Sequence, residues 1–126
     1  MFLMRSLEKN VFGDELQCCC EDPLTGYYRD GYCTTGESDF GKHITCAEMT
    51  EEFLSFSQSK GNDLITPRAE HDFKGLKPGD HWCLCVFRWL EAHKENVAPR
   101  IRLEATHIKM LELIDLEELK KFAINS

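Results

Sequence analysis

The sequence has 126 residues, of which 42% are hydrophobic, and a formal net charge of −7 at pH 7. A chain of this length builds one hydrophobic core, so we expect a single domain over residues 1–126. Within it, we expect residues 1–9 to form a loose N-terminal segment. The basic residues are few and scattered, which gives no source for the counterion release that drives nucleic-acid binding and excludes nucleic acid as the main partner. No stretch approaches the roughly 20 apolar residues of a membrane helix, and the first residues do not match a signal peptide, so we expect a cytoplasmic protein with no membrane partner.

A long loop comes first in the chain. Residues 21–42 contain four evenly spaced glycines together with three tyrosines and Phe40. The glycines interrupt any helix, whereas aromatic residues are unusual in a disordered segment, so we expect an ordered, folded-back loop. Residues 43–47 have the composition of a short strand. Thr50 can cap a helix that follows and ends at Gly61.

A second long loop, residues 62–79, follows. Loops of this length are uncommon inside compact domains and are more often functional than simple connections. Asp80 then predicts the start of a helix over residues 79–93, because its side chain can cap the first turn. Both tryptophans, Trp82 and Trp89, lie in this stretch, and its first two turns are apolar nearly all round. We therefore predict that it is the central buried helix.

The C-terminal part predicts two strands and a helix. Residues 100–104 and 110–114 alternate polar and apolar side chains, as half-buried strands do, and we expect them to pair as an antiparallel hairpin. Asp115 and Glu118 have the spacing of a capping box, which predicts a last helix. Helices and antiparallel strands in one small core indicate an α+β fold, a single-domain two-layer sandwich with a central buried helix, antiparallel strands and long ordered loops.

Several motifs resemble one family of small proteins. They are, in chain order, residues 22–33 (DPLTGYYRDGYC), 61–67 (GNDLITP), 75–85 (GLKPGDHWCLC) and 106–107 (TH). These motifs resemble the domain of unknown function 2237 family, whose members are small and mostly bacterial, and the resemblance covers nearly the whole chain. The sequence departs from the family pattern in the cysteines beside Cys19 and at Ala69, where proline is usual. The resemblance implies a single-domain α+β sandwich, and because the family has no assigned activity it implies no catalytic residue.

Seven cysteines are many for a chain of this length. The count is odd and the chain has a full apolar complement, whereas secreted disulfide scaffolds are short and use an even number, so we expect reduced thiols. No Cys-x-x-Cys pair indicates a structural metal site, although Cys19, Cys33, Cys46 and His43 could assemble one across the fold. The simpler interpretation is that the thiols pack as small hydrophobic side chains and hold no metal.

Nucleophilic thiol chemistry is an alternative. A cysteine needs a nearby histidine, cation or helix N-terminus to be a thiolate at neutral pH. Cys83 lies two residues after His81, and Cys46 lies three residues after His43, so the sequence contains two Cys-His pairs. On a helix Cys83 and Cys85 would point in different directions, whereas a strand would place them on one face. The thiol candidates are Cys33, Cys46, Cys83 and Cys85.

The two long loops carry most of the ligand-binding candidates. Arg29 could hold a carboxylate or a phosphate through its planar guanidinium fork. His107 could act as an acid or a base near neutral pH. The Asp and Asn side chains could equally stabilise turns by bonding to nearby backbone. The candidates are Asp22, Arg29, Asp30, Asn62, Asp63 and His107.

Three classes of function follow from these patterns. The first is a small binding or accessory domain, with a polar cleft between loops 21–42 and 62–79 for a small molecule or a protein partner. The second is a small enzyme that uses a loop carboxylate or a Cys-His pair. The third is a cysteine-based metal or redox protein. No motif implies a cofactor, and the oligomeric state is left open.

Overall fold

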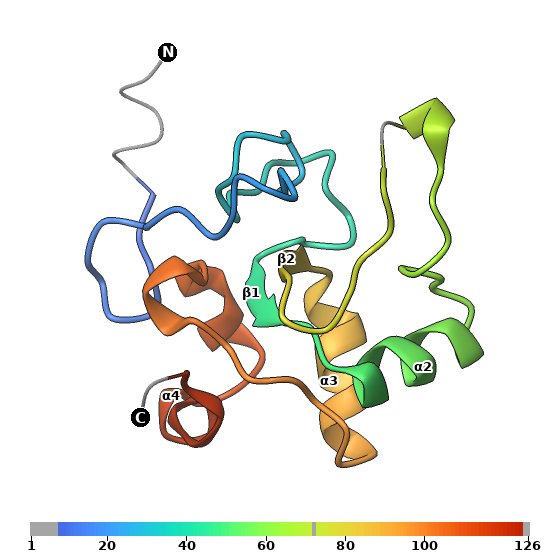
Figure 1. Cartoon of the computed structure of the whole chain (residues 1–126). Coiled ribbons are helices and arrows are strands. Elements are labelled where there is room, and N and C mark those ends of the chain that lie inside the picture. The colour runs from blue at the N-terminus through green and yellow to red at the C-terminus, as the bar shows by residue number, and fades with distance from the viewer. Residues whose placement is uncertain (1–7, 72, 125–126) are drawn as a thin grey trace.

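The computed structural model describes residues 8–71 and 73–124 (Figure 1). In this part of the chain, three α-helices and a two-stranded antiparallel sheet form one small α+β domain. The α+β prediction is therefore confirmed. Most of the expected loose segment, residues 1–9, lies outside the described residues.

The sheet lies at the centre of the molecule and pairs two short strands, β1 (Thr45–Glu48) and β2 (His81–Leu84) (Figure 1). Its register places Cys46 opposite Cys83 and Ala47 opposite Trp82. Ala47 also forms a bridge with Ile101, which extends the hydrogen bonding beyond the two strands. Most residues of the two strands are buried, and the partly exposed Glu48 and His81 lie opposite each other at one end of the sheet.

Helix α2 (Glu51–Ser59) follows β1, as the sequence predicts. The hydroxyl of Thr50 accepts a hydrogen bond of 3.0 Å from the backbone N–H of Phe53, so Thr50 is the N-cap. Phe53 and Leu54 are buried against the core. Gly61 lies just after the helix with φ of +91°, the left-handed conformation that glycine adopts most easily.

The predicted helix over residues 79–93 is wrong in its first half. Residues His81–Leu84 form strand β2, and helix α3 begins only at Val86 and ends at Lys94. An apolar stretch without clear periodicity fits a buried strand as well as a buried helix, and pairing with β1 decides between them. Asp80 caps no helix, because its carboxylate accepts a hydrogen bond from the backbone N–H of Lys77.

Helix α3 carries the centre of the core. Trp89 is completely buried, and its indole N–H donates a 3.0 Å hydrogen bond to the carbonyl oxygen of Pro99. The ring packs edge-on against Phe122, with 5.1 Å between the centroids. The second tryptophan, Trp82, lies instead on β2 and is 8% exposed. The two tryptophans therefore have different roles, one inside the core and one at its border.

The predicted C-terminal hairpin is also wrong. Short 3₁₀ helices cover Leu103–Ala105 and Ile108–Glu112, in place of the two expected strands. The alternation itself is real, since Ile101, Leu103 and Ala105 are buried, but the two segments do not pair with each other as strands. The last helix, α4 (Leu116–Leu119), begins where predicted, but the side chain of Asp115 makes no capping hydrogen bond.

Candidate functional site

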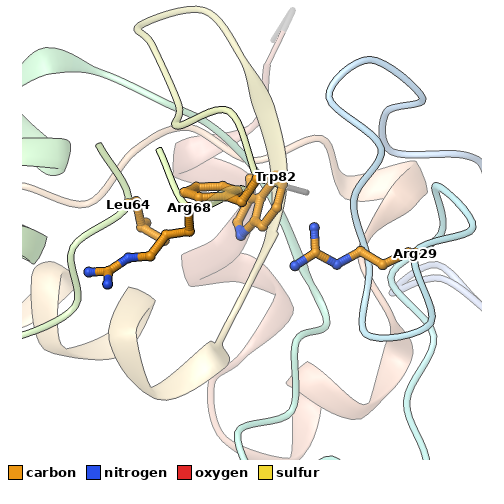
Figure 2. Close-up of a pocket in the computed structure, with 5 residues that line it drawn as sticks. Arg29, Leu64, Arg68 and Trp82 are labelled. Carbon is orange, nitrogen blue, oxygen red and sulfur yellow. The ribbon is translucent and has the colours of Figure 1, made fainter. Parts of the chain in front are cut away.

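Three adjoining depressions lie on the surface where the two long loops meet β2. Their volumes are about 220, 210 and 230 Å³, and Arg29 and Trp82 line all three. Loop 62–79 contributes Leu64, Arg68 and Phe73 to the first of them. Figure 2 shows the guanidinium of Arg29 pointing toward Trp82, whereas the guanidinium of Arg68 points away from it, on the side of Leu64. We call this combined region the Arg29–Trp82 depression.

Arg29 is held in an unusual conformation at the centre of this depression. Its φ is +55°, in the left-handed region that costs a non-glycine residue of order 1 kcal/mol. The backbone N–H donates to the carbonyl oxygen of Gly26, closing a tight turn. The guanidinium carbon lies 5.2 Å from the centroid of the Trp82 ring, which places the cation over the aromatic face. Phe73 packs edge-on against the same ring.

The acidic residues of loop 21–42 have different positions. Asp22 lines the part of the depression that also contains Glu21 and Lys74. Asp30 accepts a 3.0 Å hydrogen bond from the backbone N–H of Tyr32, so its carboxylate stabilises the turn that carries Arg29. Of these two candidates, the structure therefore places Asp22 in the wall of the depression and gives Asp30 a turn-forming contact.

Asn62 and Asp63 organise the beginning of loop 62–79. The carbonyl oxygen of Asn62 accepts a hydrogen bond from the hydroxyl of Ser57. The Asp63 carboxylate accepts bonds from the hydroxyl and the backbone N–H of Thr66 and from the N–H of Ile65, and these contacts lower its pKa to about 2. Arg68 lies 4.0 Å from the same carboxylate. Neither candidate lines the depression, but Asp63 shapes the loop that supplies Arg68 to it.

His107 lies elsewhere in the fold. Its side chain is buried, with Nε2 2.8 Å from a carboxylate oxygen of Glu8 and Nδ1 accepting a hydrogen bond from the backbone N–H of Lys109. The backbone N–H of His107 donates to Ile44, next to β1. This histidine therefore joins the N-terminal segment and a 3₁₀ helix to the sheet, away from the Arg29–Trp82 depression.

An Asp-His pair, which the sequence interpretation did not single out, borders the depression. Nδ1 of His43 lies 2.6 Å from Oδ1 of Asp39, and Oδ2 of Asp39 accepts from the His43 backbone N–H and the Thr35 hydroxyl. Burial raises the pKa of Asp39, but these hydrogen bonds outweigh it and hold the pKa below its ordinary value. His43 lines the depression beside Tyr27, whose ring stacks on the imidazole. In the sequence, the only sign of this pair was the spacing of four residues between Asp39 and His43.

Cys85 lies on the other side of His43. A Cβ atom placed on Gly41 would lie 3.6 Å from Nε2 of His43 and 3.4 Å from Sγ of Cys85, so the imidazole and the thiol approach the same point. Cys85 is partly exposed and directly precedes helix α3. The structure thus brings Asp39, His43 and Cys85 into one neighbourhood.

The expectation of reduced thiols is contradicted at four positions. Cys19 is bonded to Cys46, and Cys33 is bonded to Cys83. These four cysteines are buried and form a cluster of their own with Ala105. The partners come from distant parts of the sequence, separated by 27 and 50 residues, so counting and spacing could not identify them.

The free cysteines of the described chain are Cys18, Cys20 and Cys85. Burial, the carboxylate of Glu21 and the neighbouring Cys20 thiol raise the pKa of Cys18. This makes Cys18 a poor nucleophile at neutral pH. Both predicted Cys-His pairs lose their thiol to a disulfide, because Cys46 and Cys83 are bonded.

The fold and site define a small α+β domain with a surface depression bordered by cations, aromatic rings and an Asp-His pair. The chain belongs to the domain of unknown function 2237 family, described as an uncharacterised protein conserved in bacteria, whose model matches residues 9–123. This confirms the family resemblance over nearly the whole chain. No match was found among curated proteins. Within the described residues, every helix falls short of the length and apolar character required to cross a bilayer.

Proposed function

We propose that this protein binds a small anionic molecule, one with a carboxylate or phosphate group, in the Arg29–Trp82 depression. The observation that carries this proposal is the position of Arg29. A left-handed turn holds its guanidinium over the face of Trp82. Stacking on a ring fixes the plane of the guanidinium and leaves its N–H edge available, which suits bidentate binding of an oxyanion.

The local charge supports an anionic ligand. The chain as a whole carries a net charge of −7, so attraction of an anion requires a local group of cations. Arg29, Arg68 and Lys74 supply one around the depression, where they outnumber the carboxylates of Glu21 and Asp22. The three adjoining parts, of about 220, 210 and 230 Å³, together offer room for a small molecule.

Fluorescence can test this proposal, because Trp82 lies in the depression whereas Trp89 is inside the core. The protein is titrated with inorganic phosphate, pyrophosphate, citrate and malate, and the intrinsic emission is followed. We expect a saturable change for at least one anion. Arg29→Ala should weaken its binding at least tenfold, about 1.4 kcal/mol. Arg29→Lys should weaken it less, because the charge remains while the planar fork is lost.

Arg88→Ala is the matched control. Arg88 lies on α3, where it contacts Glu91 and the carbonyl oxygen of Lys60, outside the depression. Its removal changes the net charge as Arg29→Ala does but should leave the affinity unchanged. The proposed function would be refuted if Arg29→Ala and Arg88→Ala lost the same amount of anion affinity, or if none of the four anions bound saturably.

A second candidate function, nucleophilic thiol chemistry at Cys85, is favoured by the approach of Cys85 and His43 beside Gly41. In this candidate, Asp39 orients the imidazole through Nδ1, and the imidazole takes the thiol proton through Nε2. His43 lines the depression, so a molecule bound there would lie beside the imidazole.

The rate of alkylation by iodoacetamide tests this second candidate. Mass spectrometry of peptides gives the rate at each free cysteine of the native protein. His43→Gln should slow Cys85 several-fold while leaving Cys20 unchanged, because only Cys85 loses its base. A Cys85 rate that is the same in His43→Gln and in the unmodified protein would rule out activation by His43.

A further inference from the structure

Four buried cysteines from separate parts of the chain meet at one place. The sulfur atoms of Cys19, Cys33 and Cys46 all lie within 4.8 Å of one another. The fourth, Cys83, is bonded to Cys33 and lies directly opposite Cys46 in the sheet. The two disulfides are therefore neighbours, and one small buried volume contains all four sulfurs. We call these four residues the cysteine cluster.

Such a cluster has the composition of a tetrahedral metal site. Zinc binds four thiolates at about 2.3 Å, which separates the sulfurs by about 3.8 Å. The cluster already holds three of its sulfurs within 4.8 Å. Reduction of the two disulfides frees the bonded sulfurs to separate toward this spacing. Thiolate ligands select thiophilic ions, so zinc is preferred over magnesium or calcium.

Hydrogen bonds that do not involve the disulfides also hold the backbone around the cluster. The N–H of Cys46 donates to the hydroxyl of buried Thr106, and the N–H of Cys83 donates to the hydroxyl of buried Thr25. The N–H of Cys19 donates 2.7 Å to the carbonyl oxygen of Gly31. None of these contacts involves an S–S bond. They position the backbone of Cys46, Cys83 and Cys19, as partners of metal ligands do in structural sites.

Charge around the cluster also suits a metal complex. A zinc ion with four thiolates has a net charge of −2, which needs compensation when it is buried. Arg102 lies beside the cluster, because its guanidinium donates 3.0 Å to the carbonyl oxygen of Cys18, the residue before Cys19. This contact brings a cation to the segment that supplies one ligand.

We propose that the cysteine cluster has two states, two disulfides under oxidising conditions and a four-thiolate site for one zinc ion under reducing conditions. Each disulfide takes two electrons and two protons from a dithiol, which becomes a disulfide itself. The four thiols formed then bind Zn²⁺ through sulfur and release their protons to solvent. The inference does not rest on the anion-binding function: Cys83 lines one part of the Arg29–Trp82 depression, but the proposed zinc site uses neither Arg29 nor Trp82.

Cobalt provides the direct test. The protein is reduced with dithiothreitol under argon, freed of reductant by desalting, and titrated with Co²⁺ and then Zn²⁺. We expect the intense absorption of a tetrahedral cobalt-thiolate complex to saturate at one Co²⁺ per chain, to disappear when one equivalent of Zn²⁺ is added, and not to form in the oxidised protein. Absence of this absorption in the reduced protein would overturn the proposal.

The ligands are identified by substitution. Cys46→Ser and Cys19→Ser should each lose the cobalt absorption or weaken binding at least tenfold. Cys18→Ser, Cys20→Ser and Cys85→Ser are the matched controls, because these thiols are free and lie outside the cluster. If Cys46→Ser retained the cobalt absorption and a control variant lost it, cysteines outside the cluster would be the ligands.

Protection of thiols from alkylation identifies the zinc ligands in the unmodified sequence, so this test does not depend on whether a variant folds. The reduced protein is alkylated with iodoacetamide with and without one equivalent of Zn²⁺, and the modified peptides are quantified. Zinc should slow alkylation of Cys19, Cys33, Cys46 and Cys83 at least tenfold and leave Cys18, Cys20 and Cys85 unaffected. Equal alkylation of the four with and without zinc would contradict the proposal.

Discussion

Asp39 shows how a single residue links stability to the candidate site. Its side chain is buried at the end of loop 21–42, and both carboxylate oxygens accept hydrogen bonds. A buried carboxylate with so many partners is costly to protonate or remove. The same contacts fix the ring of His43 on the border of the depression. Asp39 therefore positions a functional candidate and stabilises the loop at the same time.

This arrangement predicts a pH-dependent contribution to stability. The pKa of Asp39 in the folded protein lies below its ordinary value of 3.8, so the stabilisation is complete above pH 3.8 and decreases as the pH falls through the folded-state pKa. We expect Asp39→Asn to lower the free energy of unfolding by about 2 kcal/mol at pH 7. The difference between variant and unmodified protein should narrow below pH 3.8.

Urea denaturation at pH 7 and at pH 3 measures the loss of unfolding free energy in Asp39→Asn and its change with pH. Asp14→Asn is a suitable control, because Asp14 is exposed and its backbone, not its carboxylate, makes the contacts with Asn10. Asp14→Asn should change the free energy of unfolding little at either pH. A difference for Asp39→Asn that widens toward low pH would contradict the assigned direction of the pKa change.

At the scale of elements, local sequence signals succeed where one residue acts on its immediate neighbours. Thr50 caps α2 through a side chain that reaches only three residues along the chain. The stretch 79–93 is different, because its first half is a strand only through hydrogen bonds to β1. Tertiary pairing thus overrides a helical interpretation that is locally consistent.

The Thr50 cap gives a prediction for α2. Thr50→Ala removes the acceptor for the Phe53 backbone N–H and should lower the free energy of unfolding by about 1 kcal/mol. Thermal or urea denaturation measures this loss. Ser55→Ala, at an exposed position in the same helix, should have an effect below about 0.5 kcal/mol. An equally small effect at Thr50 would mean that the cap does not stabilise the folded protein.

At the scale of the whole molecule, the two disulfides join parts of the chain that have little regular structure. One connects Cys19 to β1, and the other connects the loop containing Cys33 to β2. The second bond attaches loop 21–42, which supplies Arg29 to the Arg29–Trp82 depression. The sheet has only two short strands, so these bonds restrict an otherwise weakly held region.

Reduction without metal should therefore destabilise the protein. We expect dithiothreitol with a chelator present to lower the free energy of unfolding by about 3 kcal/mol for each bond lost. The urea midpoint of reduced and oxidised protein measures the change. Cys85→Ser should lose the same amount on reduction, because this cysteine forms neither disulfide. An unchanged midpoint after complete reduction would show that the bonds add nothing to stability.

The fold class, the family, the N-cap at Thr50 and the location of two long ordered loops could be predicted from the sequence, because composition and local motifs carry that information. The sequence also indicated Arg29 as a candidate ligand-binding residue, because the planar guanidinium of arginine suits an oxyanion in any fold. Only the tertiary structure decided that Arg29 lies over Trp82, that Cys85 approaches His43 and that four cysteines meet. Each of these contacts joins residues that are far apart in the chain, and their proximity depends on how the loops and strands pack together.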